Sequence, residues 1–170
     1  MIMSIKNSGL KWLWLALVML IVDQVTKQLV VAGMDLYQSI PVIPFFNLTY
    51  VHNTGAAFSF LADAGGWQRW FFSAIALGVS ALLTVWMAKA KPNQRLICIS
   101  YALIISGALG NLIDRLAFGY VIDFLDFYIG DNHWPAFNIA DSAIFVGAAL
   151  MIFEAFTNED DKSERAESKS

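Results

Sequence analysis

Residues 96–115 read LICISYALIISGALGNLIDR, and this stretch decides the fold class. Its first part, 96–113, carries no charged side chain. A helix needs about 20 predominantly apolar residues to cross the roughly 30 Å hydrocarbon core of a bilayer. Asp114 and Arg115 end the run. We therefore expect a membrane-spanning helix that carries polar groups in its last turn.

Three further apolar stretches of similar length predict spans at 11–32, 70–87 and 138–155. Each run is continuously apolar, whereas the strands of a membrane barrel would alternate. The 170 residues are 58% hydrophobic and 15% charged, which is more apolar than an ordinary soluble domain. These features predict an integral membrane protein, mainly α-helical, built as a four-transmembrane-helix bundle.

The first span also resembles the start of a secretory signal peptide, because Lys6 and Lys11 precede an apolar run. No small-x-small cleavage site follows that run. The chain instead meets Asp23 and Lys27 and then becomes apolar again. We interpret 11–32 as an uncleaved span.

The segments outside the spans predict one membrane-embedded domain over 1–157. Two long loops, 34–67 and 115–137, lie at the same end of a four-span arrangement. The first loop contains β-rich stretches at 40–43 and 46–51, which are typical of short strands on the membrane surface. Residues 158–170 hold five acids and no aromatic residue, a composition typical of a disordered tail.

The basic residues set the orientation. Of eleven lysines and arginines, eight fall at one end of the four spans: two at the start of the chain, three between the second and third spans, and three in the tail. Such residues concentrate on the cytoplasmic side of membrane proteins. Both termini are therefore predicted to be cytoplasmic, and the two long loops are predicted to face outward.

Four aspartates from separate segments approach this outer face. Asp23 lies about 18 Å along the first helix from Lys11. Asp114 ends the third span, Asp123 lies in the second outer loop, and Asp141 begins the fourth span. Ionisable groups at membrane depth are costly to bury and are therefore functional candidates.

Structural roles for these acids remain open from the residues alone. Asp23 and Lys27 are spaced i, i+4, so they could neutralise each other on one helix face. Asp114 could pair with Arg115 in the same way at the end of the third span. With Asn111, these last two residues form one polar stripe after the small residues at 107–110.

The remaining two acids have the same ambiguity. Asn138 and Asp141 match a helix N-cap followed by an acid in the first turn, a pattern that stabilises a helix start. Asp123 has no evident structural role, but composition alone does not separate it from Asp126.

The residue types restrict the chemistry. There is no Cys/His cluster, no HExxH motif and no glycine-rich phosphate loop, and the single cysteine, Cys98, cannot form an internal disulfide. We expect no metal and no other cofactor, and no basic patch with interleaved aromatics points to nucleic acid. Two aspartates that share a proton can activate water for peptide hydrolysis. A transporter and a non-catalytic scaffold remain alternatives.

Five ordered blocks carry a family resemblance: DQVTK at 23–27, NTGAAF at 53–58, GALGNLIDR at 107–115, VIDF at 121–124 and FNIADS at 137–142. Together they resemble the motifs of the lipoprotein signal peptidases of bacteria, the type II signal peptidases. One departure is small, because Ser106 stands where a glycine is frequent in that family.

The resemblance implies an intramembrane aspartic endopeptidase of the bacterial inner membrane, with its active site near the periplasmic face. It implies a prolipoprotein substrate that is cut just before a cysteine carrying diacylglycerol, with membrane lipid nearby. It also implies that the first loop forms a small β-sheet and a short helix on the outer surface. We expect the chain to act as a monomer.

The resemblance also assigns roles to individual residues. It implies that Asp123 and Asp141 are the catalytic pair, and it thereby favours Asp123 over Asp126. The positions that it implies bind substrate or brace the site are Asp23, Lys27, Asn53, Gly55, Asn111, Asp114, Arg115, Asn138 and Ala140.

Overall fold

The computed structural model describes residues 8–55, 66–91 and 93–167. A 3-10 turn, η2 (Gly9–Trp12), leads into the first of four long helices in this part of the chain. The helices are α1 (Leu13–Gly33), α2 (Trp67–Lys89), α3 (Arg95–Phe118) and α4 (Ile139–Glu167). The strands are β1 (Ser39–Ile43), β2 (Phe46–Asn53), β3 (Val121–Ile129) and β4 (Asn132–His133).

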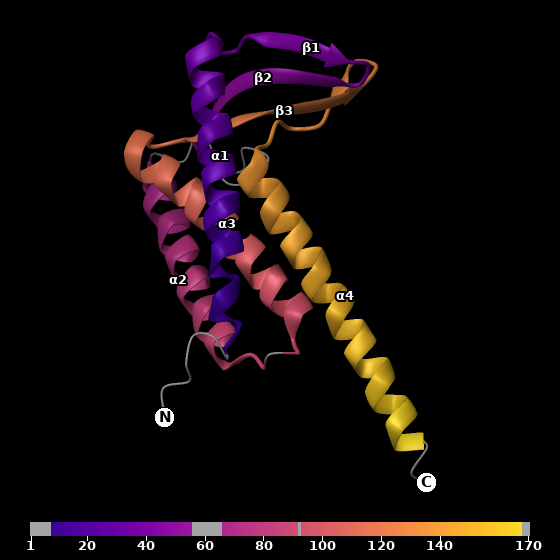
Figure 1. The fold of residues 1–170 in the computed structure, drawn as a ribbon. Helices are drawn as coiled ribbons and strands as arrows, with labels where there is room; N and C mark the ends of the chain where they lie inside the picture. Colours follow the sequence, from indigo (N-terminus) through magenta and orange to yellow (C-terminus); the bar gives the residue numbers. More distant parts are fainter. Residues whose placement is uncertain (1–7, 56–65, 92, 168–170) are drawn as a thin grey trace.

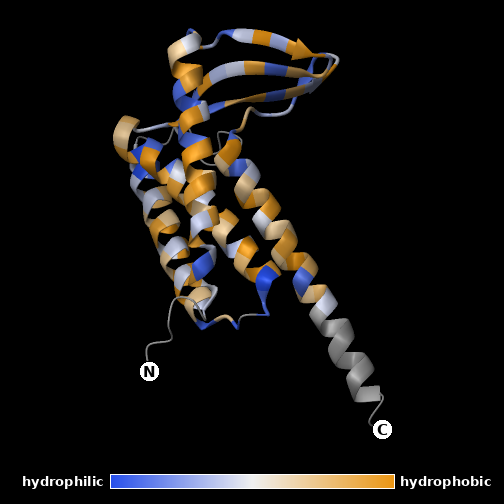
Figure 2. Ribbon diagram, in the orientation of Figure 1, coloured by the Kyte–Doolittle hydropathy of each residue, from blue (hydrophilic) through white to orange (hydrophobic). Residues whose placement is uncertain are grey.

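The helices confirm the predicted membrane fold. Segments long and apolar enough to cross a bilayer run over Gly9–Gly33, Trp67–Lys89, Arg95–Phe118 and Ile139–Thr157. Figure 2 shows hydrophobic residues along most of these helices, with hydrophilic ones gathered near the sheet and at the opposite end. α3 extends to Phe118, beyond the predicted end at 113, because its last polar residues are buried against other elements. Gly119 follows as the C-cap of α3, with a φ of 88° that suits glycine.

α3 is the central helix of the bundle. It packs against α1, α2 and α4, and more of its apolar span is buried than that of any other described helix. In Figure 1, α4 stays close to α3 near the sheet and diverges from the bundle towards its C-terminal end. α4 remains helical to Glu167, so the predicted boundary at 157 marks a change of composition. The division into a domain and a tail stays a prediction.

The sheet lies across one end of the bundle (Figure 1). Its strands are antiparallel in the order β1-β2-β3-β4. β1 and β2 confirm the two strands predicted in the first loop, whereas β3 was not predicted. The short helix implied by the resemblance is not seen in the described part of that loop, and 56–65 lie outside the described residues.

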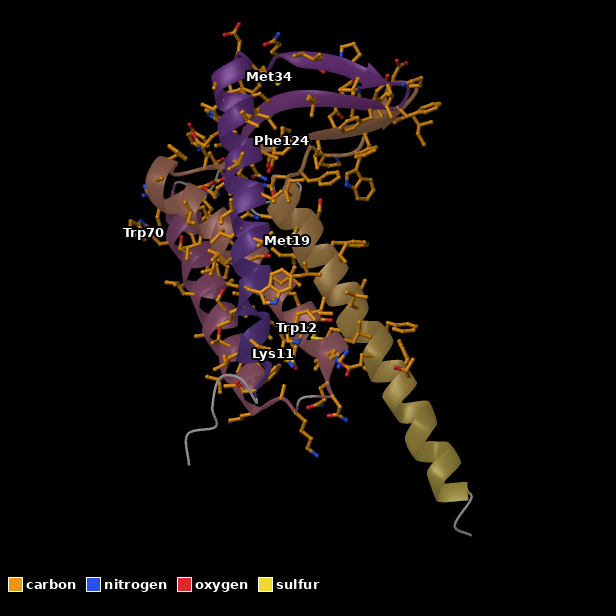
Figure 3. All side chains as sticks on the ribbon, viewed as in Figure 1. Lys11, Trp12, Met19, Met34, Trp70 and Phe124 are labelled. Atoms are coloured by element: carbon orange, nitrogen blue, oxygen red, sulfur yellow. The ribbon has the colours of Figure 1, made fainter. Side chains whose placement is uncertain are left out.

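Tryptophans mark both ends of the helical region. Trp12 lies at the end away from the sheet, and Trp70 lies nearer the sheet (Figure 3). Trp14 and Trp67 are also exposed at these two levels. Aromatic residues of this kind are enriched where a membrane protein meets the two membrane–water interfaces. The sheet therefore lies beyond the hydrocarbon core on one side.

Candidate active site

A buried lysine joins α1 to α3 close to the sheet. The ammonium group of Lys27 is fully buried and lies 2.9 Å from a carboxylate oxygen of Asp23 and 2.9 Å from one of Asp114. It also donates a 3.1 Å hydrogen bond to Oδ1 of Asn111. Because an ammonium group has three N–H donors, these three acceptors use all of them.

The two acids beside Lys27 each hold another element. Oδ1 of Asp23 accepts the backbone N–H of Ala140 at 2.8 Å, in the first turn of α4. Oδ2 of Asp114 accepts the backbone N–H of Ile122 at 3.2 Å, near the start of β3. The first N–H groups of a helix have no partner within it, so Asp23 caps α4 from a neighbouring helix. This network therefore positions both α4 and β3.

Asp123 enters the site because successive residues of a strand point to opposite faces. Its neighbours Ile122 and Phe124 belong to a buried cluster with Val30 and Tyr50, between the sheet and α1. The side chain of Asp123 points the other way and is only 2% exposed.

Two asparagine amides hold the carboxyl of Asp123. Nδ2 of Asn53, at the end of β2, donates to Oδ2 at 2.9 Å. Nδ2 of Asn138, immediately before α4, donates to Oδ1 at 2.7 Å. β2, β3 and the start of α4 therefore meet at this carboxyl group.

Asp141 lies in the first turn of α4 and shares Asn138 with Asp123. Its backbone N–H donates to Oδ1 of Asn138 at 2.9 Å, and its Oδ2 accepts the backbone N–H of Asn138 at 3.3 Å. Nδ2 of Asn111 donates to its Oδ1 at 2.7 Å. The predicted cap is therefore present, and it also places a second carboxyl near Asp123.

The surroundings raise the pKa of Asp123. Burial penalises its charged form most, and the neighbouring Asp141 raises the pKa further. Hydrogen bonds from Asn53 and Asn138 and the charge of Lys27 act in the opposite direction. The net effect raises the pKa from 3.8 to about 7. A carboxyl that keeps its proton near neutral pH, beside a second carboxyl, can serve acid–base catalysis.

Arg115 braces the first outer loop and does not pair with its sequence neighbour. Its Nη2 donates to the carbonyl oxygen of Gly55 at 3.0 Å, and its guanidinium lies 5.3 Å from the ring centre of Phe72. Asp114 pairs with Lys27 instead. The rest of the NTGAAF block, 56–58, lies outside the described residues.

Asp126 lies apart from Asp123 on the sheet. Its carboxylate accepts hydrogen bonds from Asn47 at 3.2 Å and Thr49 at 3.0 Å, and it lies 2.8 Å from Nδ1 of His133. Burial alone would raise the pKa of Asp126. The hydrogen bonds from His133, Asn47 and Thr49 outweigh that effect and hold the pKa below its ordinary value. Asp126 therefore supports the sheet.

Small residues on α3 allow the other elements to come close. A Cβ at Gly107 would collide with the carbonyl oxygen of Ala140, and one at Gly110 would lie 2.5 Å from Oδ2 of Asp23. Glycine at these two positions is therefore a geometric requirement of the site.

Comparison with known proteins identifies the family. A family model described as signal peptidase (SPase) II matches residues 15–157. The chain belongs to the signal peptidase II family. Membership makes it a membrane protease, and the transporter and scaffold alternatives are set aside.

Individual relatives agree with the signal peptidase II assignment. The lipoprotein signal peptidase of Alteromonas mediterranea is 57% identical over 171 residues, which cover 99% of this chain and 94% of that protein. The lipoprotein signal peptidase of Yersinia enterocolitica is 58% identical over 159 residues, 94% of each protein.

Solved structures agree with the fold. Two structures of a bacterial membrane enzyme, determined by the in meso method at 2.3 Å and 1.9 Å, are each 35% identical to this chain. Their TM-scores are 0.82 and 0.75. The first match covers 92% of this chain and 94% of the other, and the second covers 88% and 95%.

One residue of this signal peptidase II site was not singled out from the sequence. Nε2 of Gln24 donates to Oδ1 of Asp114 at 3.0 Å, to the carbonyl oxygen of Gly110 at 3.2 Å and to Oδ2 of Asp23 at 3.2 Å. It completes the hydrogen bonding of the buried carboxylates. Its position beside Asp23 within an apolar span was the available signal.

Proposed function

We propose that this signal peptidase II removes the signal peptide from prolipoproteins with Asp123 and Asp141 as its catalytic pair. One carboxylate takes a proton from water, and the other carboxyl, in its protonated form, polarises the scissile carbonyl. The observation that supports the assignment most directly is Asn138, whose side-chain amide donates to the carboxyl of Asp123 and whose backbone N–H donates to the carboxyl of Asp141.

The residues around the pair form its frame in this proposal. Lys27, with its two acids, fixes α1, α3 and α4 relative to one another. Asn53 and Asn111 orient one carboxyl each, and Arg115 holds the loop that begins after β2. The frame comprises Asp23, Lys27, Asn53, Gly55, Asn111, Asp114, Arg115, Asn138 and Ala140.

The position of the pair along the helices supports cleavage near the outer interface. Asn111 lies about 24 Å along the axis of α3 from Arg95, at 1.5 Å per residue. The hydrocarbon core is roughly 30 Å thick, so the pair lies near its far boundary. The basic residues at the other end, Lys89, Lys91 and Arg95, support a cytoplasmic location for that end. Water and a lipid-anchored peptide can meet at such a depth.

This location fits a substrate anchored in the same membrane. We assign it as a prolipoprotein with a diacylglyceryl-modified cysteine, cut just before that cysteine, in the bacterial inner membrane. The relatives named lipoprotein signal peptidase support this substrate class. One copy of the chain supplies both carboxyl groups, so a monomer suffices, with 1–157 as the functional domain and 158–170 as a cytoplasmic tail.

The test is cleavage of a purified prolipoprotein by the full chain in lipid vesicles. We expect Asp123→Asn and Asp141→Asn each to lose activity by at least about a hundredfold, because an amide cannot exchange the required proton. Asp126→Asn is the matched control, since it makes the same carboxyl-to-amide change three residues along β3. Near-normal cleavage by either dyad variant in folded protein would remove that residue from the pair.

A further inference from the structure

The amide of Asn111 has one allowed orientation. Its Oδ1 lies 3.1 Å from Nζ of Lys27 and accepts from Nδ2 of Asn138 at 3.2 Å. An ammonium group carries donors only, so the amide atom facing it must be the oxygen. Nδ2 of Asn111 therefore faces the other way, where it donates to Asp141.

Asp141 is surrounded as an anion would be. Its Oδ1 receives the 2.7 Å hydrogen bond from Asn111, and its Oδ2 receives the backbone N–H of Asn138. It lies in the first turn of α4, where the helix dipole favours negative charge. Its side chain is only half-buried.

Asp123 has the less favourable surroundings for a charge. It is 2% exposed and lies on a strand with no helix terminus of its own. Among the described residues, the donors to its carboxyl are the side-chain amides of Asn53 and Asn138. Each carboxyl oxygen has two lone pairs, so either oxygen of Asp123 can carry a proton while it still accepts the hydrogen bond from its asparagine.

The other charged groups around the pair do not reverse the difference. Within the described residues they come from two elements, α1 and α3. Lys27 is already neutralised by Asp23 and Asp114. Arg115 donates to backbone carbonyl oxygens of Gly55 and Asn111. The charged groups around the pair, within the described residues, are Asp23, Lys27, Asp114 and Arg115.

We propose that Asp141 is the ionised base of the pair, that Asp123 carries the proton, and that Asn111, oriented by Lys27, is the positioning residue that maintains this division. The inference rests on the proposed function and assigns the two roles within it.

The division gives a complete reaction. Asp141 takes a proton from water as the water oxygen bonds to the scissile carbonyl carbon, and Asp123 gives its proton to the carbonyl oxygen. This produces a neutral gem-diol. Asp141 then protonates the leaving nitrogen while Asp123 takes a proton from one gem-diol hydroxyl, and the C–N bond breaks. A carboxylic acid and an amine leave, and both aspartates return to their starting states.

The experiment compares the pH profiles of cleavage for two isosteric variants in lipid vesicles. Asn111→Asp keeps the acceptor for Lys27 but replaces the donor to Asp141 by a carboxylate oxygen. The acidic limb of the profile, where activity rises with pH, reports ionisation of the base Asp141. We expect this limb to move to higher pH by roughly one unit, because Asp141 loses a hydrogen-bond donor and gains a neighbouring negative charge. The basic limb should stay in place.

Asn53→Asp is the matched variant on the other side of the pair. It keeps the acceptor for the backbone N–H of Gly55 but replaces the donor to Asp123. We expect the basic limb to move to higher pH by a similar amount, because the protonated form of Asp123 is favoured further. The acidic limb should stay in place.

The outcomes separate the two proposals. If Asn111→Asp moved the basic limb and Asn53→Asp moved the acidic limb, the roles of the two aspartates would be reversed. If each variant moved both limbs equally, the two aspartates would share the proton. Either result overturns the assignment of roles while leaving the dyad intact. Lower activity at every pH without a limb shift would make Asn111 merely structural. If thermal unfolding shows that an aspartate variant is unfolded, Asn111→Ala and Asn53→Ala test the same signs with smaller shifts. Cleavage by Asp123→Asn or Asp141→Asn would defeat the proposed function itself.

Discussion

Lys27 shows how a charge is kept inside a membrane protein. Removing an ion from water costs several kcal/mol even after the protein relaxes. Here the ammonium is fully buried and every N–H has an acceptor, while Gln24 and two backbone N–H groups complete the hydrogen bonds of the acids. Removal of one member would leave uncompensated charge on the others.

We therefore expect Lys27→Met to lower the free energy of unfolding by about 3–5 kcal/mol, the usual effect of breaking a buried ion pair. Denaturant unfolding in detergent, followed by tryptophan fluorescence, measures this quantity. Lys89→Met is the control, because Lys89 is exposed at the other end of the bundle. Equal, small effects of the two substitutions would mean that the buried network contributes little to stability.

Asp123 should make stability depend on pH in a predictable direction. Its pKa is about 7 in the folded state against 3.8 ordinarily, so between these values the folded protein holds a proton that the unfolded chain has lost. Stability from this group is therefore lost as the pH rises from about 4 to 7. We expect Asp123→Asn to flatten that decline in melting temperature, measured in detergent at a series of pH values.

The control for this pH effect is Asp126→Asn, whose effect should have the opposite sign. The pKa of Asp126 is held below its ordinary value, so this residue stabilises the protein above that value and the contribution is lost on acidification. Parallel curves for wild type and Asp123→Asn over pH 4 to 7 would contradict the raised pKa.

At the scale of elements, the sequence predicted those helices and strands that a local pattern of residues marks. Continuous apolar runs located the four helices, and β-rich stretches located β1 and β2. β3 was missed because the first four of its residues are all buried, so no polar–apolar alternation marks them as a strand. Without that strand, the opposite directions of Asp123 and Asp126, three residues apart, could not be deduced.

Local sequence patterns also could not identify the ion-pair and hydrogen-bond partners of the site residues. Sequence proximity suggested that Asp114 pairs with Arg115, but the fold gives it Lys27, from a helix far away in the chain. Asn138 and Asp141 were recognised as a cap. The bridge from Asn138 to Asp123 depends on how α4 meets β3, and that follows only from tertiary packing.

The close approach of α3 to its neighbours gives a test at this scale. A Cβ at Gly110 would lie 2.5 Å from Oδ2 of Asp23, whose carboxylate is held by Lys27 and caps α4. We expect Gly110→Ala to lower kcat by about ten- to a hundredfold, since a displacement near 1 Å is enough to disturb catalytic geometry.

Gly78→Ala is the matched control for Gly110→Ala. Gly78 is interior to α2, and within the described residues an added Cβ would meet no atom within 4 Å beyond the adjoining residues and backbone of its own helix. Alanine is favoured over glycine inside a helix, so this variant should be as stable as the wild type or slightly more so, with unchanged kcat. If both variants retained full activity, the packing at Gly110 would not matter for catalysis.

At the scale of the whole molecule, the distribution of charge and the position of the proposed site predict a single orientation in the membrane. The proposed catalytic pair and the sheet lie at one end of the helices, and the short basic connection between α2 and α3 lies at the other (Figure 1). In the predicted orientation, we expect substrate to approach the first end from the outer surface or from the outer half of the bilayer.

Sided labelling of single cysteines tests this orientation. In a Cys98→Ala background, we expect Asp131→Cys, exposed beside the β3–β4 hairpin, to react with a membrane-impermeant maleimide in spheroplasts. Lys91→Cys, exposed between α2 and α3, should react only after permeabilisation, because positively charged connections stay in the cytoplasm. Both variants should still cleave prolipoprotein, which confirms that they are folded. The reverse labelling pattern would place the proposed catalytic pair at the cytoplasmic face and would overturn the proposed location of cleavage.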